Sequence, residues 1–194
     1  MVGFTGFASR RVDPSLPPLP PGQHFERGFP VLTAGPDPNI KVWELQLATE
    51  TGQRSWSWED FLALPQEDVT TDIHCVTSWS KLGTHWRGVS VDTLFEGLPT
   101  EHRYALARSY GGYTTNLPLE DLLGGKAWVV HTFEGAPLSS EHGGPARLFV
   151  PHLYFWKSAK WLQGIQTMAT DRPGFWENYG YHNHGDPWKE ERYS

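Results

Sequence analysis

Hydrophobic and polar residues alternate along several short stretches of this chain, and a period of two residues is typical of strands that are half-buried in a sheet. The clearest alternation covers residues 42–47, with the sequence Val-Trp-Glu-Leu-Gln-Leu. Runs of β-branched, aromatic and other apolar residues predict four further strands, at residues 69–76, 104–109, 128–133 and 147–150. The pattern is that of a β-rich protein.

Three other stretches have helical spacing, and all three are short. Residues 57–64 begin with a serine that can cap a helix, carry acidic residues in the first turn and stop near Pro65. Residues 90–95 and 118–123 are each followed closely by a glycine, a residue that commonly ends a helix. Together with the strands, these segments predict an α+β fold.

Composition supports this interpretation and limits the number of domains. The chain has 194 residues, including ten Trp, seven Tyr, ten Phe, 20 Gly and 16 Pro, which favours buried aromatic side chains and frequent turns over a helical bundle. Residues 1–28 are rich in proline and poor in apolar residues, so we expect an extended arm there and one domain over residues 29–194. The expected fold class is α+β: a mixed, β-rich single domain with short helices and long loops.

Charge and hydropathy exclude some partners. The formal net charge of −6 disfavours nonspecific binding to nucleic acid or to anionic membranes, and no apolar run approaches the roughly 20 residues that span a bilayer. Arg10 and Arg11 suggest a twin-arginine export signal, but no apolar segment follows them. We therefore expect a cytoplasmic protein, unless a leader has been removed, with no nucleic-acid partner and no membrane span.

The chain has a single cysteine, Cys75, which rules out an internal disulfide and every metal site that needs several cysteines. A lone cysteine in a β-branched run is most often a small buried apolar residue. Its neighbours Asp72, His74, Thr77 and Ser80 are polar, however, which raises two alternatives. Cys75 could be a nucleophile paired with a histidine, or a soft ligand of a transition metal.

Two later clusters carry basic residues. Residues 141–147 combine two glycines, a proline and a histidine with Arg147, which can bind a phosphate through two parallel hydrogen bonds, although an ordinary turn with a solvated arginine is an equal alternative. In residues 154–161, Lys157 and Lys160 could donate to an anion or simply lie on an aromatic surface. The second cluster lies about ten residues after Arg147, on the far side of a predicted strand, which favours a common site for both clusters.

Other motifs give weaker signals. His182 and His184 resemble a pair of metal ligands, but no further set of ligands has zinc spacing, so polar loop histidines are the favoured interpretation. The chain contains no Walker loop, GxGxxG, GxSxG or CxxCH motif.

Taken in order, these segments resemble the molybdenum-cofactor domain of the sulfite oxidase family, and most closely its small bacterial single-domain branch. The resemblance spans roughly residues 20–190. It rests on seven segments, at residues 29–36, 74–80, 86–91, 111–118, 141–151, 154–161 and 174–188. Each segment is weak alone, whereas the ordered set is specific.

The resemblance implies roles for individual residues. Cys75 matches the catalytic cysteine whose thiolate binds molybdenum beside the two dithiolene sulfurs of a pyranopterin. The residues that match cofactor-binding positions are Leu32, Thr33, Ser109, His142, Arg147, Ser158, Ala159 and Lys160. For a hydroxyl group that lines the substrate pocket, we expect Tyr110 and Tyr113.

The activity implied is that of a molybdopterin-dependent oxidoreductase that transfers an oxygen atom to or from a small oxyanion or oxide, such as sulfite, an S-oxide or an N-oxide. The expected cofactor is molybdenum–molybdopterin (Mo-MPT) without an added nucleotide. Because the chain carries no heme domain, the resemblance implies a separate electron-transfer partner: a cytochrome, a flavoprotein or a quinone-linked subunit. Ser78 is neutral at a position where a charged side chain could meet an oxyanion, which weakens the case for sulfite.

Two alternatives remain open at this point. The chain could be a non-redox, cysteine-dependent enzyme that uses Cys75 with His74 or His142, although neighbouring residues on a strand point to opposite faces, which makes His74 a poor base. It could also be a catalytically inactive, aromatic-rich binding module, since ten tryptophans can form a sugar-binding or partner-binding surface.

Overall fold

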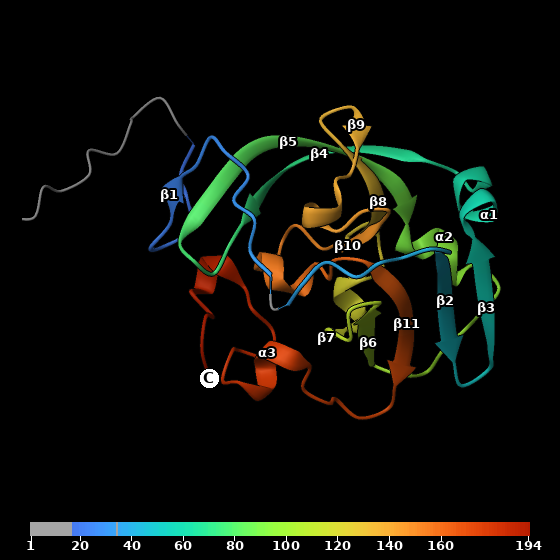
Figure 1. The fold of residues 1–194 in the computed structure, drawn as a ribbon. Helices are drawn as coiled ribbons and strands as arrows, with labels where there is room; N and C mark the ends of the chain where they lie inside the picture. Colours follow the sequence, from blue (N-terminus) through green and yellow to red (C-terminus); the bar gives the residue numbers. More distant parts are fainter. Residues whose placement is uncertain (1–16, 34) are drawn as a thin grey trace, which may run out of the picture.

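The fold, taken from a computed structural model that describes residues 17–33 and 35–194, consists of two β-sheets joined by long loops, with short helices at their edges (Figure 1). Most of the expected N-terminal arm, residues 1–16, lies outside the described residues. In the described part of the chain, no helix is long and apolar enough to cross a membrane.

The first sheet is built around one long strand, β5 (Trp79–Ser90). Its strand order is β1-β5-β8-β10, with β4 also paired to β5 and β9 paired to β8. The bounds of the other strands are β1 (His24–Phe25), β4 (Glu67–His74), β8 (Trp128–Phe133), β9 (Ala136–Pro137) and β10 (Arg147–Phe149). Antiparallel β4 and β5 form a hairpin whose turn carries Cys75.

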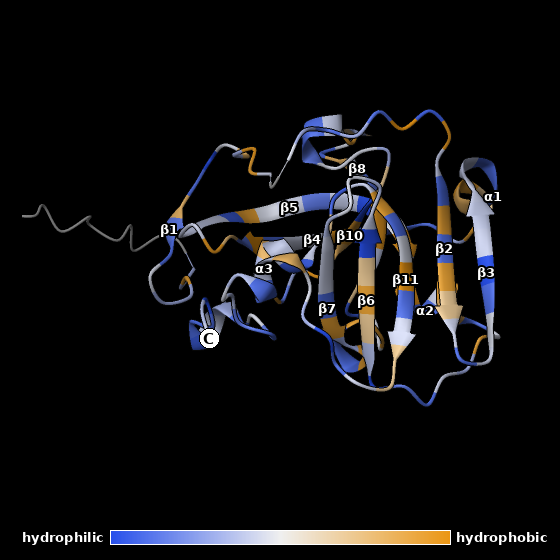
Figure 2. Cartoon of the chain, turned by 60° about the horizontal axis from the view of Figure 1, so that its bottom comes forward, coloured by the Kyte–Doolittle hydropathy of each residue, from blue (hydrophilic) through white to orange (hydrophobic). Residues whose placement is uncertain are grey.

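The second sheet has the order β3-β2-β11-β6-β7 (Figure 2). Its strands are β2 (Glu44–Thr49), β3 (Gly52–Ser57), β6 (Tyr104–Ser109), β7 (Thr114–Pro118) and β11 (Leu162–Met168). Alternation in β2 buries Leu45 and Leu47, while the edge strand β3 is largely hydrophilic and exposed. The parallel pair β2–β11 joins distant parts of the chain and brings residues 162–168 into the middle of the sheet.

Local sequence explains two of the three α-helices. In α1 (Trp58–Ala63), the Ser57 side chain accepts from the Asp60 amide while the Asp60 carboxylate accepts from the Ser57 amide, which completes a capping box. Ser90 caps α2 (Val91–Phe95) through its side chain, which accepts from the Asp92 amide. The helices predicted at residues 57–64 and 90–95 are therefore confirmed.

The prediction of an α-helix at residues 118–123 is wrong. The structure has a 3₁₀ turn at Leu119–Asp121 instead. Strand β7 continues to Pro118, and Gly124 and Gly125 follow with positive φ, so too few residues remain for an α-helix. A third α-helix, α3 (Phe175–Asn178), lies in the C-terminal segment, where the sequence shows no clear period.

The main core draws side chains from both sheets, including Leu47 and Ile165 from the second and Val129 and Leu148 from the first. A smaller aromatic cluster that contains Cys75 lies at one end of the first sheet. The predicted class, a mixed β-rich α+β fold with short helices and long loops, is confirmed.

Candidate active site

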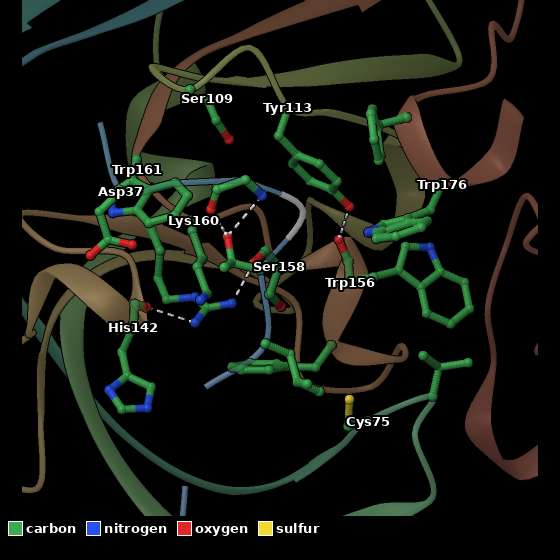
Figure 3. Close-up of a pocket in the computed structure, with 18 of the residues that line it drawn as sticks. Asp37, Cys75, Ser109, Tyr113, His142, Trp156, Ser158, Lys160, Trp161 and Trp176 are labelled. Carbon is green, nitrogen blue, oxygen red and sulfur yellow. Dashed lines mark hydrogen bonds between the residues drawn. The ribbon is translucent and has the colours of Figure 1, made fainter. Parts of the chain in front are cut away.

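A cavity of about 590 Å³ lies where five segments meet, a volume in the usual range for small-molecule and cofactor sites (Figure 3). Apolar and aromatic side chains form most of its wall. The contributing segments are the loop 29–38, the β4–β5 turn 75–79, the β6–β7 turn 109–113, residues 142–161 and the C-terminal segment 175–181. The cavity therefore depends on nearly the whole chain.

Cys75 directs its sulfur into this cavity from the β4–β5 turn (Figure 3). Its amide donates to the Trp79 carbonyl at 2.8 Å, and its own carbonyl accepts from the Ser78 amide at 3.0 Å and from Gln23 Nε2 at 3.1 Å. Ser78 adopts φ of 74°, a left-handed conformation that closes the turn. These bonds fix the position from which the sulfur faces the cavity.

The surroundings of the thiol do not resemble those of an activated nucleophile. Burial raises the pKa of Cys75, and hydrogen bonds from the Thr77 hydroxyl and from nearby backbone amides act in the opposite direction. His74 Nδ1 is bonded to Ser80 Oγ at 2.7 Å and not to the sulfur. His74 is thus not placed to act as a base for Cys75.

Arg147 is the buried cation of the site, with 1% of its surface exposed. Nη1 donates to the His142 carbonyl at 2.8 Å, Nη2 donates to the Ser158 carbonyl at 2.5 Å, and the guanidinium lies 4.1 Å from the centre of the Phe155 ring. Burial lowers its pKa to about 9, so it remains charged at neutral pH. Within the described residues, its Nε atom is buried without a hydrogen-bond partner.

Lys160 lines the cavity close to Arg147. Burial, together with the charge of Arg147, lowers its pKa to about 8, and Nζ donates to the Glu141 carbonyl at 2.5 Å. Gly143 brings the two segments together, because a Cβ atom there would lie 2.9 Å from Lys160 Cα and its φ is +105°. The glycine is thus required where residue 143 lies directly against Lys160.

Three more predicted residues line the cavity in different ways. His142 stacks on Phe29 at 3.9 Å, and both of its ring nitrogens are engaged, Nδ1 with Ser139 Oγ and Nε2 with the Phe29 carbonyl. Ser158 Oγ accepts from the backbone amide of Val150, directly after β10, at 2.9 Å. Ser109 Oγ is buried and has no partner among the described residues.

The two predicted tyrosines are separated. Tyr113 lines the cavity and donates its hydroxyl to the Trp156 carbonyl at 2.6 Å, and burial raises its pKa well above the usual value. Tyr110 does not line the cavity, because its side chain reaches the first residue of β2, where its hydroxyl donates to the Glu44 carbonyl at 2.9 Å and accepts from the Glu44 amide at 2.7 Å. The expectation that Tyr110 lines the substrate pocket is therefore wrong.

Of the remaining predicted residues, some line the cavity and others do not. Leu32 and Thr33 line the cavity from the loop that precedes β2. Ala159 is fully packed and only its backbone bonds, through a carbonyl that accepts from the Leu148 amide at 2.9 Å, so it is not a lining residue. Lys157, considered above as an anion donor, points away from the cavity into the interior, where Glu177 holds it at 2.7 Å.

Sequence reasoning missed an aromatic wall that the C-terminal segment contributes to the cavity. Trp176 stacks on Tyr181 with ring centroids 5.1 Å apart, and Trp156 meets Tyr181 edge-on at the same separation. The Glu177 carboxylate accepts from Trp156 Nε1 at 3.0 Å and thereby links this wall to Lys157. The density of aromatic residues after position 171 was the signal that could have indicated the wall.

The C-terminal histidines belong to a separate cluster. His184 bonds Glu191 Oε2 at 2.9 Å through Nδ1 and Asp121 Oδ2 at 3.1 Å through Nε2, and these bonds raise its pKa. His152 bonds the other Asp121 oxygen at 2.9 Å. Within residues 17–33 and 35–194, no group of three or more histidine, cysteine, aspartate and glutamate side chains is placed to hold a metal ion.

Comparison with known proteins identifies the family. The family model described as "Oxidoreductase molybdopterin binding domain" matches residues 33–176. The chain belongs to the sulfite oxidase family of molybdopterin-binding oxidoreductases. It is 43% identical to the protein named uncharacterized oxidoreductase YuiH of Bacillus subtilis, over 91% of this chain and 92% of that protein. The predicted family and the predicted class of enzyme, an oxidoreductase, are therefore confirmed.

Two more distant proteins resemble this member of the family. The putative protein-methionine-sulfoxide reductase subunit YedZ1 of Azospira oryzae is 26% identical over 87% of this chain and 68% of that protein. The fold is also similar to that of the sulfane dehydrogenase SoxCD of Paracoccus pantotrophus, with a TM-score of 0.58 and 17% identity. The match covers 66% of this chain but only 38% of the SoxCD chain.

The residues around the cavity fit a large, anionic, sulfur-containing cofactor. Three buried donors that line the cavity lack partners among the described residues: Ser109 Oγ, Trp79 Nε1 and Arg147 Nε. Buried polar groups of this kind are normally satisfied, so they indicate a ligand rich in acceptors. Arg147 and Lys160 add two cations that suit a phosphate, and Cys75 adds a soft donor that suits molybdenum.

Proposed function

We propose that this protein transfers an oxygen atom to or from a small sulfur or nitrogen oxide, or to sulfite, in the cavity beside Cys75, with Mo-MPT as the cofactor. The observation that carries the proposal is the placement of the only cysteine sulfur in the same 590 Å³ cavity as Arg147 and Lys160. When bound, this cofactor supplies two-electron oxygen-atom transfer.

Each group in the cavity then has a defined task. Arg147 and Lys160 would bind the phosphate of the pterin, with Ser109 and Ser158 beside them, and Cys75 would bind the metal through its thiolate. Because Arg147 is held by two backbone carbonyls, its guanidinium is already oriented before any anion binds. The aromatic wall of Trp156, Trp176 and Tyr181, with Tyr113 beside it, would exclude water from the metal end.

The reaction needs a source or acceptor of electrons. Reduction of an oxide consumes two electrons and two protons and releases the parent compound and water, and oxidation runs the same balance in reverse. A separate cytochrome, flavoprotein or quinone-linked subunit would exchange these electrons. The name of the relative YedZ1 refers to methionine sulfoxide, which supports an S-oxide as one candidate substrate.

Metal analysis and substitution of the ligand test the proposal. Protein from a host that makes the cofactor should contain about one molybdenum per chain, and it should oxidise a reduced dye when a sulfoxide or an N-oxide is added. Cys75→Ser should abolish this turnover, while circular dichroism shows an unchanged fold. Val42→Ala, at an exposed position outside the cavity lining, provides the control and should retain activity. Wild-type turnover in the Cys75→Ser protein would refute the proposal.

A further inference from the structure

Thr77 places its hydroxyl group on the cavity side of the β4–β5 turn and donates a hydrogen bond to Cys75 Sγ at 3.2 Å. This is the side-chain hydrogen bond that the described part of the chain offers to the sulfur. A donor–sulfur distance of 3.2 Å is short enough for an effective bond, because sulfur is larger than oxygen. Thr77 therefore donates to the sulfur atom that would bind the metal in the proposed function.

The turn leaves the Thr77 side chain little freedom to move away. The residues on both sides are tied down: Cys75 donates to the Trp79 carbonyl at 2.8 Å, and the Ser78 carbonyl accepts from the His24 amide at 2.8 Å. Ser78, with φ of 74°, reverses the chain directly after Thr77. The hydroxyl is thus oriented by the backbone, although the residue itself is exposed.

Other polar side chains near the turn are committed elsewhere. Gln23 donates to the Cys75 carbonyl at 3.1 Å rather than to the sulfur. Arg192 lies close to the turn, but its guanidinium donates to the carbonyls of Val76 and Pro21. Neither side chain would replace the hydroxyl of Thr77 if that group were removed.

We propose that Thr77 is a positioning residue that sets the reduction potential of the metal bound by Cys75. Hydrogen bonds to a ligating thiolate withdraw electron density from the sulfur, so the ligand donates less charge and the metal is reduced more easily. The inference rests on the proposed function, since it requires Cys75 to be the metal ligand.

Two substitutions separate the hydroxyl from the shape of the side chain. Thr77→Val has nearly the same volume without the donor, and Thr77→Ser keeps the donor with a smaller side chain. Redox titration of the holoprotein, followed by electron paramagnetic resonance, should give Thr77→Val a lower midpoint potential than wild type. We expect about a tenfold change in the one-electron reduction equilibrium, equivalent to about 59 mV. Thr77→Ser should remain near the wild-type potential.

A second readout is the sulfur-to-metal charge-transfer band in the absorption spectrum, which should shift in Thr77→Val and not in Thr77→Ser. Equal potentials and spectra for wild type and Thr77→Val, at equal molybdenum content, would overturn the inference. Loss of molybdenum from Thr77→Val would overturn it as well, because the role is tuning and not retention. Failure of the proposed function is distinguishable, since Cys75→Ser would then keep the wild-type metal spectrum.

Discussion

The ion pair between Lys157 and Glu177 offers a quantitative test of how the cavity wall is held. Both side chains have 0% exposure, and Nζ lies 2.7 Å from Glu177 Oε1. Nζ also donates to the carbonyls of Asn116 at 2.7 Å and Asn183 at 2.5 Å, which ties β7, α3 and the C-terminal segment together. Burial lowers the pKa of Lys157, and the charge of Glu177 opposes that shift.

Removing one partner leaves the other charge buried without compensation. We therefore expect Lys157→Met and Glu177→Gln each to lower the free energy of unfolding by about 3–5 kcal/mol. This is a large share of the roughly 5–15 kcal/mol that stabilises a typical domain. The double variant removes both charges, and its Gln can still accept from Trp156 Nε1, so its loss should be smaller than the sum of the single losses by about 2–4 kcal/mol.

The assay is urea unfolding of the four proteins, followed by tryptophan fluorescence and circular dichroism. Arg87→Met is the control, because it breaks the exposed pair of Arg87 with Asp68, where the side chains are 43% and 77% exposed, and it should leave the unfolding midpoint nearly unchanged. Additive losses in the double variant, within about 0.5 kcal/mol, would refute the reasoning. So would single variants as stable as the control.

Three further predictions follow from the geometry. The bonds of His184 to carboxylates raise its pKa above 6.5. Its contribution to the free energy of unfolding is therefore present below pH 6.5 and is lost as pH rises through the raised pKa. Thermal unfolding from pH 6 to 9 should show this decline, and the decline should be smaller in His184→Gln. Lys160→Met should lower the molybdenum and pterin content of the purified protein by about tenfold, whereas an unchanged content would contradict a phosphate-binding role. Gly88→Ala places a Cβ atom 2.1 Å from a carbonyl oxygen of β8 and should cost about 3 kcal/mol or more of stability, measured by urea unfolding, while Gly35→Ala, with nothing within 4 Å, should be neutral.

Strands with a clear pattern could be predicted from the sequence, and those without one could not. The strands predicted at residues 104–109 and 128–133 coincide with β6 and β8. The long β5 was not predicted because its buried positions over residues 83–88 include Thr84 and Gly88, so burial alternates there while hydrophobicity does not. In β11, Gly164 interrupts the pattern, since a side chain there would lie 2.9 Å from the Gln46 carbonyl oxygen of β2.

The candidate site shows the same limit. Ordered segments pointed to Cys75, Arg147 and Lys160, and the structure brings all three to one cavity. Spacing could not reveal that Lys157 turns into the protein interior while Lys160 turns toward the cavity, because a 3₁₀ turn at Phe155–Lys157 sets the direction of the chain there. The pairing of Lys157 with Glu177 crosses 20 residues and follows from the tertiary fold alone.

The aromatic wall at residues 175–181 has a consequence for how the protein is made. The ribosome delivers this segment after every other part of the cavity, including the turn with Cys75 and the strand with Arg147. A nascent chain can therefore complete its two sheets while this side of the cavity still lacks its cover. Closure of the cavity is then a late step of biogenesis, and the inward-facing charge of Glu177 arrives with the segment that performs it.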